Sequence, residues 1–424
     1  MNAPGERADA VVVGAGLAGL AAAVRLASTT GPGRRILLLE AGAGPGGRAR
    51  TTAFRGHRLD LGPRALYPAA ERQLRALGIR ITGGTPGLAR AGALRDGTLH
   101  PGYAAPGALL RTPLLSPRER LAVARLLALC RSRSDPRRAG TDAAQWLADR
   151  LPSARARQAA FALLRISAYV GSPGAVAADA LAAHFAGARR GVRYVDGGWG
   201  SVVAALAARA AELGVHLRTG ARAVAVEGGT APCVHLADGS ETGARAVIVA
   251  GPPPRTAAAL LGLPALAAHA GPPLRTACLA VALRRPPEPL RPLVFGVDEP
   301  VYFSDFSVTA RLAPPGGSVL HLARYDDGTA PGPARVREQL YALLDRCRPG
   351  WRDALVHERF LPGITTMSAV PAARTGGLAG RPGVRAADRP GVFLAGDWVG
   401  PAGLLADASV LSGVAAADAA AARL

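Results

Sequence analysis

The stretch DAVVVGAGLAGLAAAVRLA, residues 9–27, decides how the first part of the chain folds, because it carries almost no charge and yet contains Gly14, Gly16 and Gly19. A membrane-spanning helix needs about 20 mainly apolar residues, whereas the three glycines interrupt this run and Arg25 follows them. An export signal begins with basic residues, whereas acidic side chains stand before this run. We therefore expect the stretch to belong to a folded domain of a cytoplasmic protein.

The same stretch matches the GxGxxG pattern of a dinucleotide-binding turn. The β-branched run from Ala10 to Val13 predicts a strand, and the residues from Leu20 to Ala27 predict a helix. The first glycine permits a tight turn, the second lets a pyrophosphate approach the backbone at the helix N-terminus, and the third lets helix and strand pack closely. The cofactor contacts predicted in this turn are Gly14, Ala15, Gly16, Leu17, Ala18 and Gly19.

An acidic residue follows at the spacing that such a unit requires. A second apolar run, RRILLLE, ends in Glu40, which lies 21 residues beyond Gly19. At this place an acidic side chain accepts hydrogen bonds from the ribose hydroxyls of an adenosine. Strand, turn, helix, strand and acid together predict one dinucleotide-binding unit, and we expect no separate site for bound NAD(P)H.

The residues after Glu40 indicate which dinucleotide is bound. GGRART, residues 46–51, resembles the GGRxxT/S element of the flavin amine oxidase and phytoene desaturase superfamily, in which this element carries FAD. Two glycines allow close backbone approach, and an arginine supplies a planar cation for a pyrophosphate oxygen. The resemblance implies FAD as the cofactor, with Gly47 and Arg48 among its contacts.

Two stretches in the middle of the chain resemble the same superfamily. DLGPRAL, residues 60–66, resembles the segment that passes beside the isoalloxazine ring. Residues 194–228 resemble a unit in which one backbone position touches the adenine. The contacts that these resemblances imply are Gly62, Pro63, Arg64 and Val224.

The end of the chain carries the most specific resemblance. LAGDW, residues 394–398, resembles the superfamily's C-terminal GD motif, and DASVLSG, residues 407–413, resembles the helix that follows it. In the superfamily the acid of this motif contacts the ribityl or pyrophosphate part of FAD, and the helix N-terminus directs its dipole at the flavin pyrimidine. The resemblance implies contacts from Gly396, Asp397 and Leu405, with the helix beginning near Gly403.

The resemblance implies an α/β fold. We expect a Rossmann-like FAD-binding domain, of the GR2 type of flavoproteins, together with a substrate domain made of a mixed sheet and a helical lobe. The FAD-binding domain is expected to be discontinuous, with segments 1–80, 190–272 and 380–424. Segments 81–189, which hold the helical insert, and 273–379 are expected to form the substrate-binding domain.

Local patterns predict the elements of the two inserts. Ser116 and Pro117 are typical of a helix start, and three more helices are expected between residues 142 and 187. Strands are predicted in TACLAVALR, PVYFSDFS, SVLHLARY and ALVHERFL, with a helix in ARVREQLYALLDRC. Asp238 and Gly239 predict a hairpin turn that joins PCVHLADG to ARAVIVAGPPP.

The net charge and the cysteines indicate which partners and ligands to expect. The chain has 51 basic residues against 30 acidic ones, a formal net charge of +21, and every basic residue is an arginine. The arginines are scattered, so we expect no nucleic-acid partner and leave peripheral contact with the inner face of a membrane open. The four cysteines are far apart and form no CxxC pair, so no metal site is expected. The sequence does not specify the oligomeric state.

The superfamily divides by substrate, and the sequence favours an apolar one. Its amine oxidases usually hold a lysine that reaches the flavin N5 through water, and this chain has no lysine. LAGDW and SVLSG look closer to the carotenoid desaturase and hydroxysqualene dehydroxylase branch, whose substrates are long isoprenoids. We expect hydride transfer between the flavin N5 and an apolar, isoprenoid-like or polyene-like small molecule, as in a desaturase or dehydrogenase, with an electron acceptor that the sequence does not specify. Two alternatives stay open: an amine or amino-acid oxidase, and a non-catalytic flavin-binding partner subunit.

No catalytic side chain is predicted, because flavin chemistry does not require a separate base. The polar residues considered for the substrate face are Arg64, Tyr67, Tyr302, Asp305 and His321, together with His57. A buried tyrosine or histidine in a sheet is more often a hydrogen-bonded core residue than a catalytic one, so none of these is assigned a role.

Overall fold

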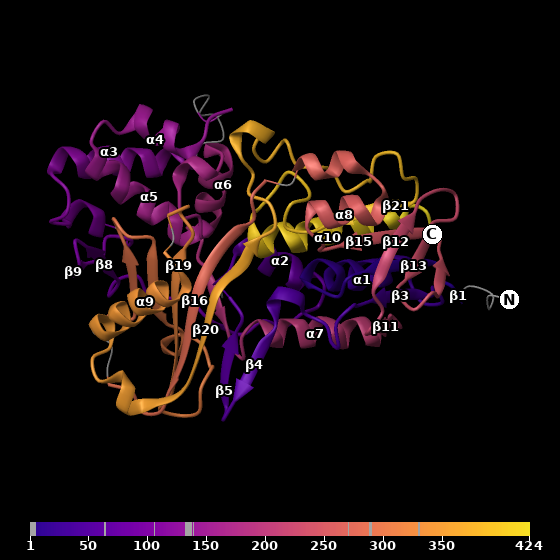
Figure 1. Ribbon diagram of the computed structural model, residues 1–424, viewed down its shortest axis with the longest axis horizontal. Helices are drawn as coiled ribbons and strands as arrows, with labels where there is room; N and C mark the ends of the chain where they lie inside the picture. Colours follow the sequence, from indigo (N-terminus) through magenta and orange to yellow (C-terminus); the bar gives the residue numbers. More distant parts are fainter. Residues whose placement is uncertain are drawn as a thin grey trace.

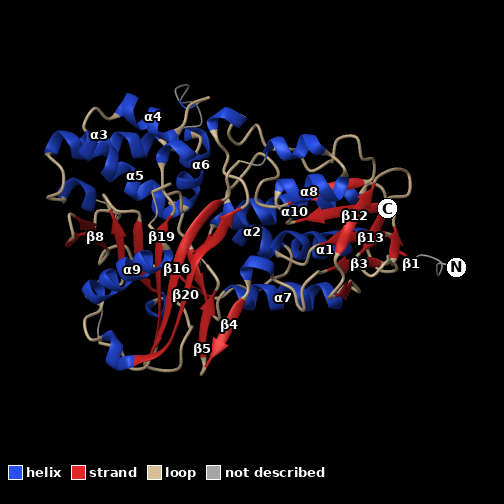
Figure 2. Cartoon of the chain, viewed as in Figure 1, coloured by secondary structure: helices blue, strands red, loops and turns tan. Residues whose placement is uncertain are grey.

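The computed structural model describes residues 6–62, 65–105, 107–131, 138, 140–269, 271–287, 291–329 and 331–424. A parallel sheet with its helices lies at one end of the molecule, and a larger sheet with a helical lobe lies at the other (Figure 1, Figure 2). The α/β fold class expected from the sequence is confirmed.

Five short strands form the parallel sheet in the order β11-β3-β2-β15-β21. They are β2 Ala10–Val13, β3 Ile36–Leu39, β11 His216–Arg218, β15 Ala246–Ala250 and β21 Val392–Ala395. All except β11 are buried at every residue, which is typical of a parallel sheet covered on both faces. Because β2 is the central strand, the glycine turn that follows it leads to the middle of the carboxyl edge of the sheet.

Helices cover one face of this sheet, and a second sheet covers the other. Helices α1 (Leu17–Thr30), α7 (Trp199–Glu212) and α10 (Leu405–Ala421) pack on one set of alternating strand side chains. Helix α8 (Pro254–Leu261) and a four-stranded sheet pack on the other set. The strands of that sheet, in the order β1-β14-β13-β12, are β1 Glu6–Arg7, β14 Glu241–Gly243, β13 Cys233–Leu236 and β12 Ala223–Glu227.

One strand pairing differs from the expected one. Asp238 and Gly239 do lie in a hairpin turn, with φ 82° at Gly239, but the turn joins β13 to β14. The run AVIVA is β15, which pairs in parallel with β2 and β21. A strand that is apolar on both faces is most stable between two layers, whereas a strand of a surface sheet keeps one polar face. The expected pairing of PCVHLADG with ARAVIVAGPPP is therefore wrong.

The larger sheet has seven strands in the order β20-β16-β19-β18-β17-β8-β9. Its strands are β8 Gly92–Arg95, β9 Thr98–Pro101, β16 Leu274–Leu283, β17 Leu293–Gly296, β18 Val301–Asp305, β19 Ser318–Tyr325 and β20 Leu355–Met367. One face packs on helix α9 (Pro333–Cys347), and the other packs on the helical lobe. The four strands and the helix expected in this insert are confirmed, whereas β8, β9 and β17 were not predicted.

The helical lobe consists of α3 Pro117–Leu129, α4 Ala143–Arg150, α5 Ala154–Ala168 and α6 Ala178–Ala188. The start of α3 is fixed by a capping box, in which Ser116 Oγ accepts a hydrogen bond from Glu119 N and Ser116 N donates to Glu119 Oε2. The helix start predicted from Ser116 and Pro117 is confirmed, as are the three helices that follow it.

The remaining elements connect these layers. The small strands are β4 Thr51–Phe54 with β5 His57–Asp60, and β6 Ala65–Leu66 with β10 Arg193–Val195 and β7 Gly83–Gly84. The other helices are α2 Pro68–Ala76 and the 3₁₀ helices η1 Gly47–Ala49, η2 Ala108–Arg111, η4 Pro173–Ala175, η5 Pro264–His269, η6 Phe306–Val308, η7 Trp351–Ala354 and η8 Ala373–Thr375.

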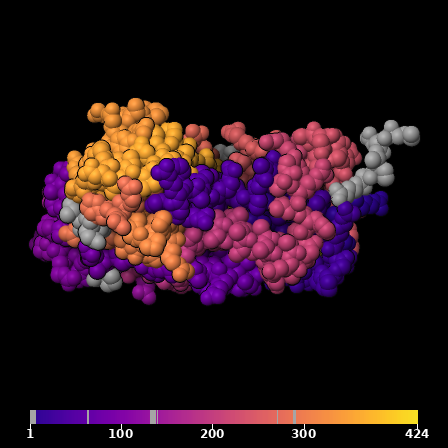
Figure 3. All heavy atoms as spheres, turned by 90° about the horizontal axis from the view of Figure 1, so that it is seen from below, coloured from indigo at the N-terminus to yellow at the C-terminus, as the bar shows by residue number. Residues whose placement is uncertain are grey.

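Segments far apart in the sequence share one body. The parallel sheet takes its strands from within 1–80, 190–272 and 380–424, and Figure 3 shows early, middle and late segments side by side on one surface. The domain limits expected from the sequence stay a prediction. Within the described ranges, no helix is both long enough and apolar enough to cross a membrane.

Helix α1 approaches its neighbours so closely that two of its contacts exclude a side chain. A Cβ at Gly19 would lie 1.8 Å from Gly14 O, and a Cβ at Gly413 of α10 would lie 2.3 Å from Ala18 O. Gly187, in α6, has open space where a Cβ would lie. The two helical glycines Gly413 and Gly187 therefore form a matched pair.

We expect the G413A variant to lose about 1–3 kcal/mol of unfolding free energy, because the added methyl group forces α10 away from α1. The G187A variant should gain about 0.5–1 kcal/mol, since alanine favours a helix over glycine. Urea unfolding of both variants measures the difference. A G413A protein as stable as the unmodified chain would contradict the close contact of α1 with α10.

Candidate active site

A cavity of about 690 Å³ lies at the carboxyl edge of the parallel sheet. Its wall includes the turn after β2, the end of β3, part of β20 and the first turn of α10. The sequence-predicted residues that line it are Gly14, Gly16, Leu17, Ala18, Glu40, Gly47, Arg48, Gly62, Asp397 and Leu405. Residues from both ends of the chain thus meet in one wall.

The glycine turn gives the cavity its backbone wall. Gly14 has φ 99°, and a Cβ there would lie 2.3 Å from the carbonyl oxygen of Ala250. Gly16 lines the cavity, and apart from Gly16 itself and its chain neighbours no described residue has an atom within 4 Å of the position that its Cβ would take. Leu17 begins α1 at the cavity, so the unpaired N–H groups of the first turn lie where an anion would bind. Gly19 lies behind this wall.

Glu40 is held at the end of β3 by two backbone groups. Its Oε2 accepts a hydrogen bond from Ala15 N at 2.8 Å, and its Oε1 accepts one from Gly42 N at 2.7 Å. Ala15 therefore positions the carboxylate and is not part of the cavity wall. A carboxylate oxygen accepts more than one hydrogen bond, so a fixed Glu40 is still able to accept ribose hydroxyls.

An ion pair joins the two halves of the site. Arg48 Nη1 donates to Asp397 Oδ2 at 2.7 Å, and Ser368 N donates to the same oxygen at 2.8 Å. The Asp397 side chain is 2% exposed and that of Arg48 is 45% exposed. The sequence predicts that the Arg48 cation contacts a pyrophosphate oxygen, whereas in the structure the guanidinium is paired with the acid of the C-terminal motif.

The charge of Asp397 is stabilised by this arrangement. Burial alone would raise its pKa, but the Arg48 charge and the hydrogen bonds from Arg48 and Ser368 hold the pKa below its ordinary value. The charge of Asp397 in turn raises the pKa of Arg48. The second carboxylate oxygen, Oδ1, is buried and has no hydrogen-bond partner among the described residues. A hydroxyl-bearing cofactor chain in the cavity would supply one, which fits the ribityl part of FAD.

The first turn of α10 closes the wall. Gly396 does not line the cavity; its N donates to Ser412 Oγ at 2.9 Å, which fixes β21 against α10. The helix begins at Leu405, two residues beyond the expected start, and Leu405 has φ 55°, a strained conformation for leucine. Asp407 accepts a hydrogen bond from Ala70 N at 2.6 Å.

One part of the cavity wall is apolar, and we call it the inner end. It is formed by Leu61, Ala65, Ile364 and Leu405 together with Tyr169. Tyr169 ends α5 in the left-handed conformation, with φ 60°. Sequence reasoning missed Tyr169 and Ile364, because a tyrosine after a helix carries no local signal and the expected strand ended at Leu361. Strand β20 continues to Met367 and brings Ile364 to the cavity.

The other polar candidates lie elsewhere in the core. Tyr67 donates to Ser167 O, and Tyr302 Oη lies 2.8 Å from Tyr194 Oη. Asp305 forms a buried ion pair with Arg348, and burial raises the pKa of this aspartate. His321 is buried in β19, and His57 Nε2 lies 3.1 Å from Leu283 O. The cavity wall contains none of Tyr67, Tyr302, Asp305, His321 and His57 among its described residues.

Three of the predicted contacts need separate comment. Val224 is 51% exposed and is not among the residues that line the cavity, and its predicted backbone contact with the adenine stays a prediction. The pairing of β12 with β13 is irregular between Ala223 and Ala225, which turns Val224 outward and leaves residues 221–223 at the wall. Pro63 and Arg64 lie outside the described residues.

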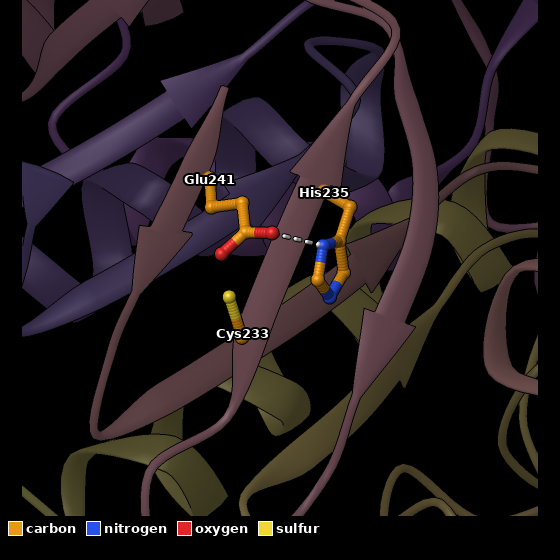
Figure 4. Close-up of side chains that lie close together, drawn as sticks. All are labelled: Cys233, His235 and Glu241. Carbon is orange, nitrogen blue, oxygen red and sulfur yellow. Dashed lines mark hydrogen bonds and ion pairs between the residues drawn. The ribbon is translucent and has the colours of Figure 1, made fainter. Parts of the chain in front are cut away.

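A second group of donor side chains lies on the four-stranded sheet. Cys233, His235 and Glu241 point toward one another from neighbouring strands (Figure 4), with one ligand atom of each within 4.8 Å of the others. His235 Nδ1 lies 3.1 Å from Glu241 Oε1, and Nε2 lies 3.2 Å from Glu227 Oε1. Both ring nitrogens therefore face carboxylates, and the group is an ion-pair network when His235 is protonated. The expected absence of a metal stays a prediction.

These features describe a site for an elongated dinucleotide. A helix N-terminus suits its phosphates, a fixed acid at the end of β3 suits a ribose, and an unpaired carboxylate oxygen suits a hydroxyl farther along.

Comparison with known proteins agrees with this geometry. The sequence model of the family described as flavin containing amine oxidoreductase matches residues 17–421. Polyamine oxidase 1 of Oryza sativa subsp. japonica is 50% identical over 52 residues, which is 12% of this chain and 10% of that protein. The matched part thus spans about a tenth of that relative.

Solved structures share the fold. An oxidoreductase from Methanosarcina mazei superposes with a TM-score of 0.75 at 18% identity, covering 96% of this chain and 99% of that one. Cyclohexylamine oxidase from Brevibacterium oxydans IH-35A superposes with a TM-score of 0.73 at 17% identity, covering 99% of each chain. Identities at this level indicate a common fold.

We expect the D397N variant to lose about 2–3 kcal/mol of unfolding free energy and to retain less FAD, because the Arg48 cation loses its partner. The exposed pair of Arg25 with Asp418, at 2.6 Å, provides the control. The D418N variant should change stability by less than about 1 kcal/mol and leave FAD retention unchanged. Denaturant unfolding and the flavin-to-protein absorbance ratio measure both effects. Equal retention in the two variants would remove Asp397 from the cofactor site.

The stability difference between the D407N variant and the unmodified protein should depend on pH. Burial raises the pKa of Asp407 from 3.8 to about 6, so the folded state binds this proton more tightly than the unfolded state does. The resulting stabilisation is complete below about pH 4 and is lost as pH rises through 6. Asparagine can still accept the hydrogen bond from Ala70 N. The D407N variant should therefore gain up to about 3 kcal/mol relative to the unmodified protein between pH 4 and 7. A pH-independent difference would contradict the raised pKa.

Proposed function

The chain belongs to the flavin-containing amine oxidoreductase family, and from this premise we propose that it transfers hydride between its flavin and an apolar, isoprenoid-like or polyene-like substrate. The family uses flavin, so the protein is an FAD-dependent oxidoreductase. When bound, FAD supplies the hydride acceptor at its N5. What the chain itself contributes is the position of the substrate, the exclusion of water and the control of charge around the cavity.

The residues that would hold FAD follow from the site. The N-terminus of α1 at Gly16 would face the pyrophosphate, and Glu40 would bind the adenosine ribose. Asp397 Oδ1 would accept a hydroxyl of the ribityl chain. The first turn of α10, at Leu405, would direct the helix dipole at the ring system, where it stabilises negative charge.

The composition of the cavity wall is the observation that supports an apolar substrate. Its inner end consists of small and aliphatic side chains with the ring of Tyr169. Among the described wall residues the acids are Glu40 and Asp397, and both are engaged by backbone groups or by Arg48. An ammonium substrate requires a carboxylate or an aromatic cage, because desolvating an unpaired cation is costly.

The charges near this end also disfavour a cation. Arg165 is 4% exposed, and its Nη2 donates to two backbone carbonyls, Gly296 O and Glu299 O. Arg381 Nη1 donates to Gly403 O at 2.8 Å, and burial lowers its pKa to about 10. The two buried guanidinium groups add positive charge to this region, although Arg381 also interacts with the charges of Asp397 and Asp179. An uncharged substrate does not experience that repulsion.

Amine oxidation is the second candidate, and the comparisons give it comparable support. The relative over 52 residues is a polyamine oxidase, and one structural neighbour is a cyclohexylamine oxidase. Against it stand the absence of lysine from the sequence and the engaged acids of the cavity wall.

The test is anaerobic bleaching of the bound flavin by a panel of squalene, phytoene and farnesol on one side, and putrescine and cyclohexylamine on the other. We expect bleaching by an isoprenoid and none by the amines, because an uncharged molecule enters the inner end without the cost of desolvating a charge. Rapid bleaching by amines alone would replace this proposal with the second candidate. A flavin that resists every compound but is reduced by light would indicate a non-catalytic subunit.

A further inference from the structure

Five of the seven tyrosines of the chain interact with one another in and beside the core layer between the large sheet and the helical lobe. They are Tyr67, Tyr169, Tyr194, Tyr302 and Tyr325, and each is at most 7% exposed. A hydrophobic layer normally holds few hydroxyl groups, and those that it holds are hydrogen-bonded. A hydroxyl with a hydrogen-bond partner in the protein is therefore explained by the fold, whereas a buried hydroxyl without one needs another explanation.

Four of these hydroxyls have partners in the protein. Tyr67 donates to Ser167 O, and Tyr194 and Tyr302 bond each other at 2.8 Å. The Tyr169 oxygen accepts from the backbone N–H of Ala65 and contacts the Tyr67 hydroxyl. The hydroxyls of these four tyrosines are therefore explained by hydrogen bonds within the core.

Two hydroxyls in this layer are buried without a partner among the described residues: Tyr325 Oη and Thr276 Oγ1. Their residues are 1% and 0% exposed. Thr276 and Tyr325 are directly paired across β16 and β19, so both side chains point to the same face of the sheet. A buried hydroxyl without a partner carries a desolvation cost, which a bound ligand would relieve.

Each unpaired hydroxyl belongs to a residue that neighbours a residue of the cavity wall. Thr276 is also paired with Ile364 of β20, and Ile364 lines the cavity from the same face of the sheet. The ring of Tyr325 meets the ring of Tyr169 edge to face, with 5.9 Å between the centroids, and Tyr169 lines the cavity. A rotation of the Tyr169 side chain would therefore join the cavity to the two hydroxyls.

We propose that Tyr325 and Thr276 form a polar subsite that binds an alcohol or carbonyl oxygen at one end of an otherwise apolar substrate. The inference rests on the proposed function and narrows it to oxygen-bearing isoprenoids. An oxygen suits the subsite better than an ammonium group, because the guanidinium carbon of Arg165 lies 5.9 Å from the centroid of the Tyr325 ring. Burial also raises the pKa of Tyr325 well above its ordinary value, so the hydroxyl stays protonated and is able both to donate and to accept.

The first test uses stability, which needs no knowledge of the substrate. In the FAD-loaded enzyme without ligand, the Y325F and T276V variants should melt at the same temperature as the unmodified protein or higher, because each removes an unpaired hydroxyl without changing shape. Y341F is the control: Tyr341 Oη donates to Glu358, so this variant should lose about 2 °C or more. A comparable loss in Y325F and T276V would show that their hydroxyls serve the fold, and would overturn the proposal.

The second test compares two ligands that differ by one hydroxyl, farnesol and farnesene, through the change that each causes in the flavin absorbance under anaerobic conditions. The unmodified enzyme should bind farnesol about tenfold more tightly, and Y325F should lose most of that preference while Y341F keeps it. Equal binding of the two ligands by the unmodified enzyme would overturn the subsite. If neither ligand binds, the proposed isoprenoid substrate is wrong. The melting temperatures then decide separately whether the hydroxyls of Tyr325 and Thr276 contribute to the stability of the fold.

Discussion

The structure depends on the absence of side chains at two glycines, one in the turn between β2 and α1 and one in the first turn of α1. Gly14 and Gly19 leave no room for a Cβ against Ala250 O and Gly14 O, so strand, turn and helix lie in direct backbone contact. This contact fixes the N-terminus of α1 at the carboxyl edge of the sheet. Glu40, Arg48 and Asp397 then lie around the N-terminus of α1. Together they form part of the cavity wall.

Features encoded in neighbouring residues could be predicted from the sequence. The glycine pattern and the acid at Glu40 lie within one strand-turn-helix-strand unit, and Ser116 and Pro117 lie within one helix turn, so a short stretch of sequence contains the signal for each. The fold class was expected from the resemblance of several motifs to one superfamily, and fully apolar runs such as ILLL and VFLA are consistent with it, because they are typical of a covered parallel sheet.

Features that depend on distant contacts could not be predicted. The partner of Arg48 is 349 residues away, and nothing near Arg48 indicates that Asp397 will take its charge. The outward turn of Val224 comes from an irregular pairing with β13, and the place of Tyr169 comes from a left-handed helix end. Each is decided by packing between layers, which a single sequence does not reveal.

The order of the strands has a consequence for how the protein is made. Strand β21 and helix α10 come after every other element in the chain, yet β21 pairs with β15, α10 packs on α1, and Asp397 joins Arg48. During synthesis these residues leave the ribosome after the strand and helix that they pack on, so a nascent polypeptide that has not reached β21 holds only half of the site. A product that terminates before β21 lacks Asp397 and α10 and cannot complete the cavity wall.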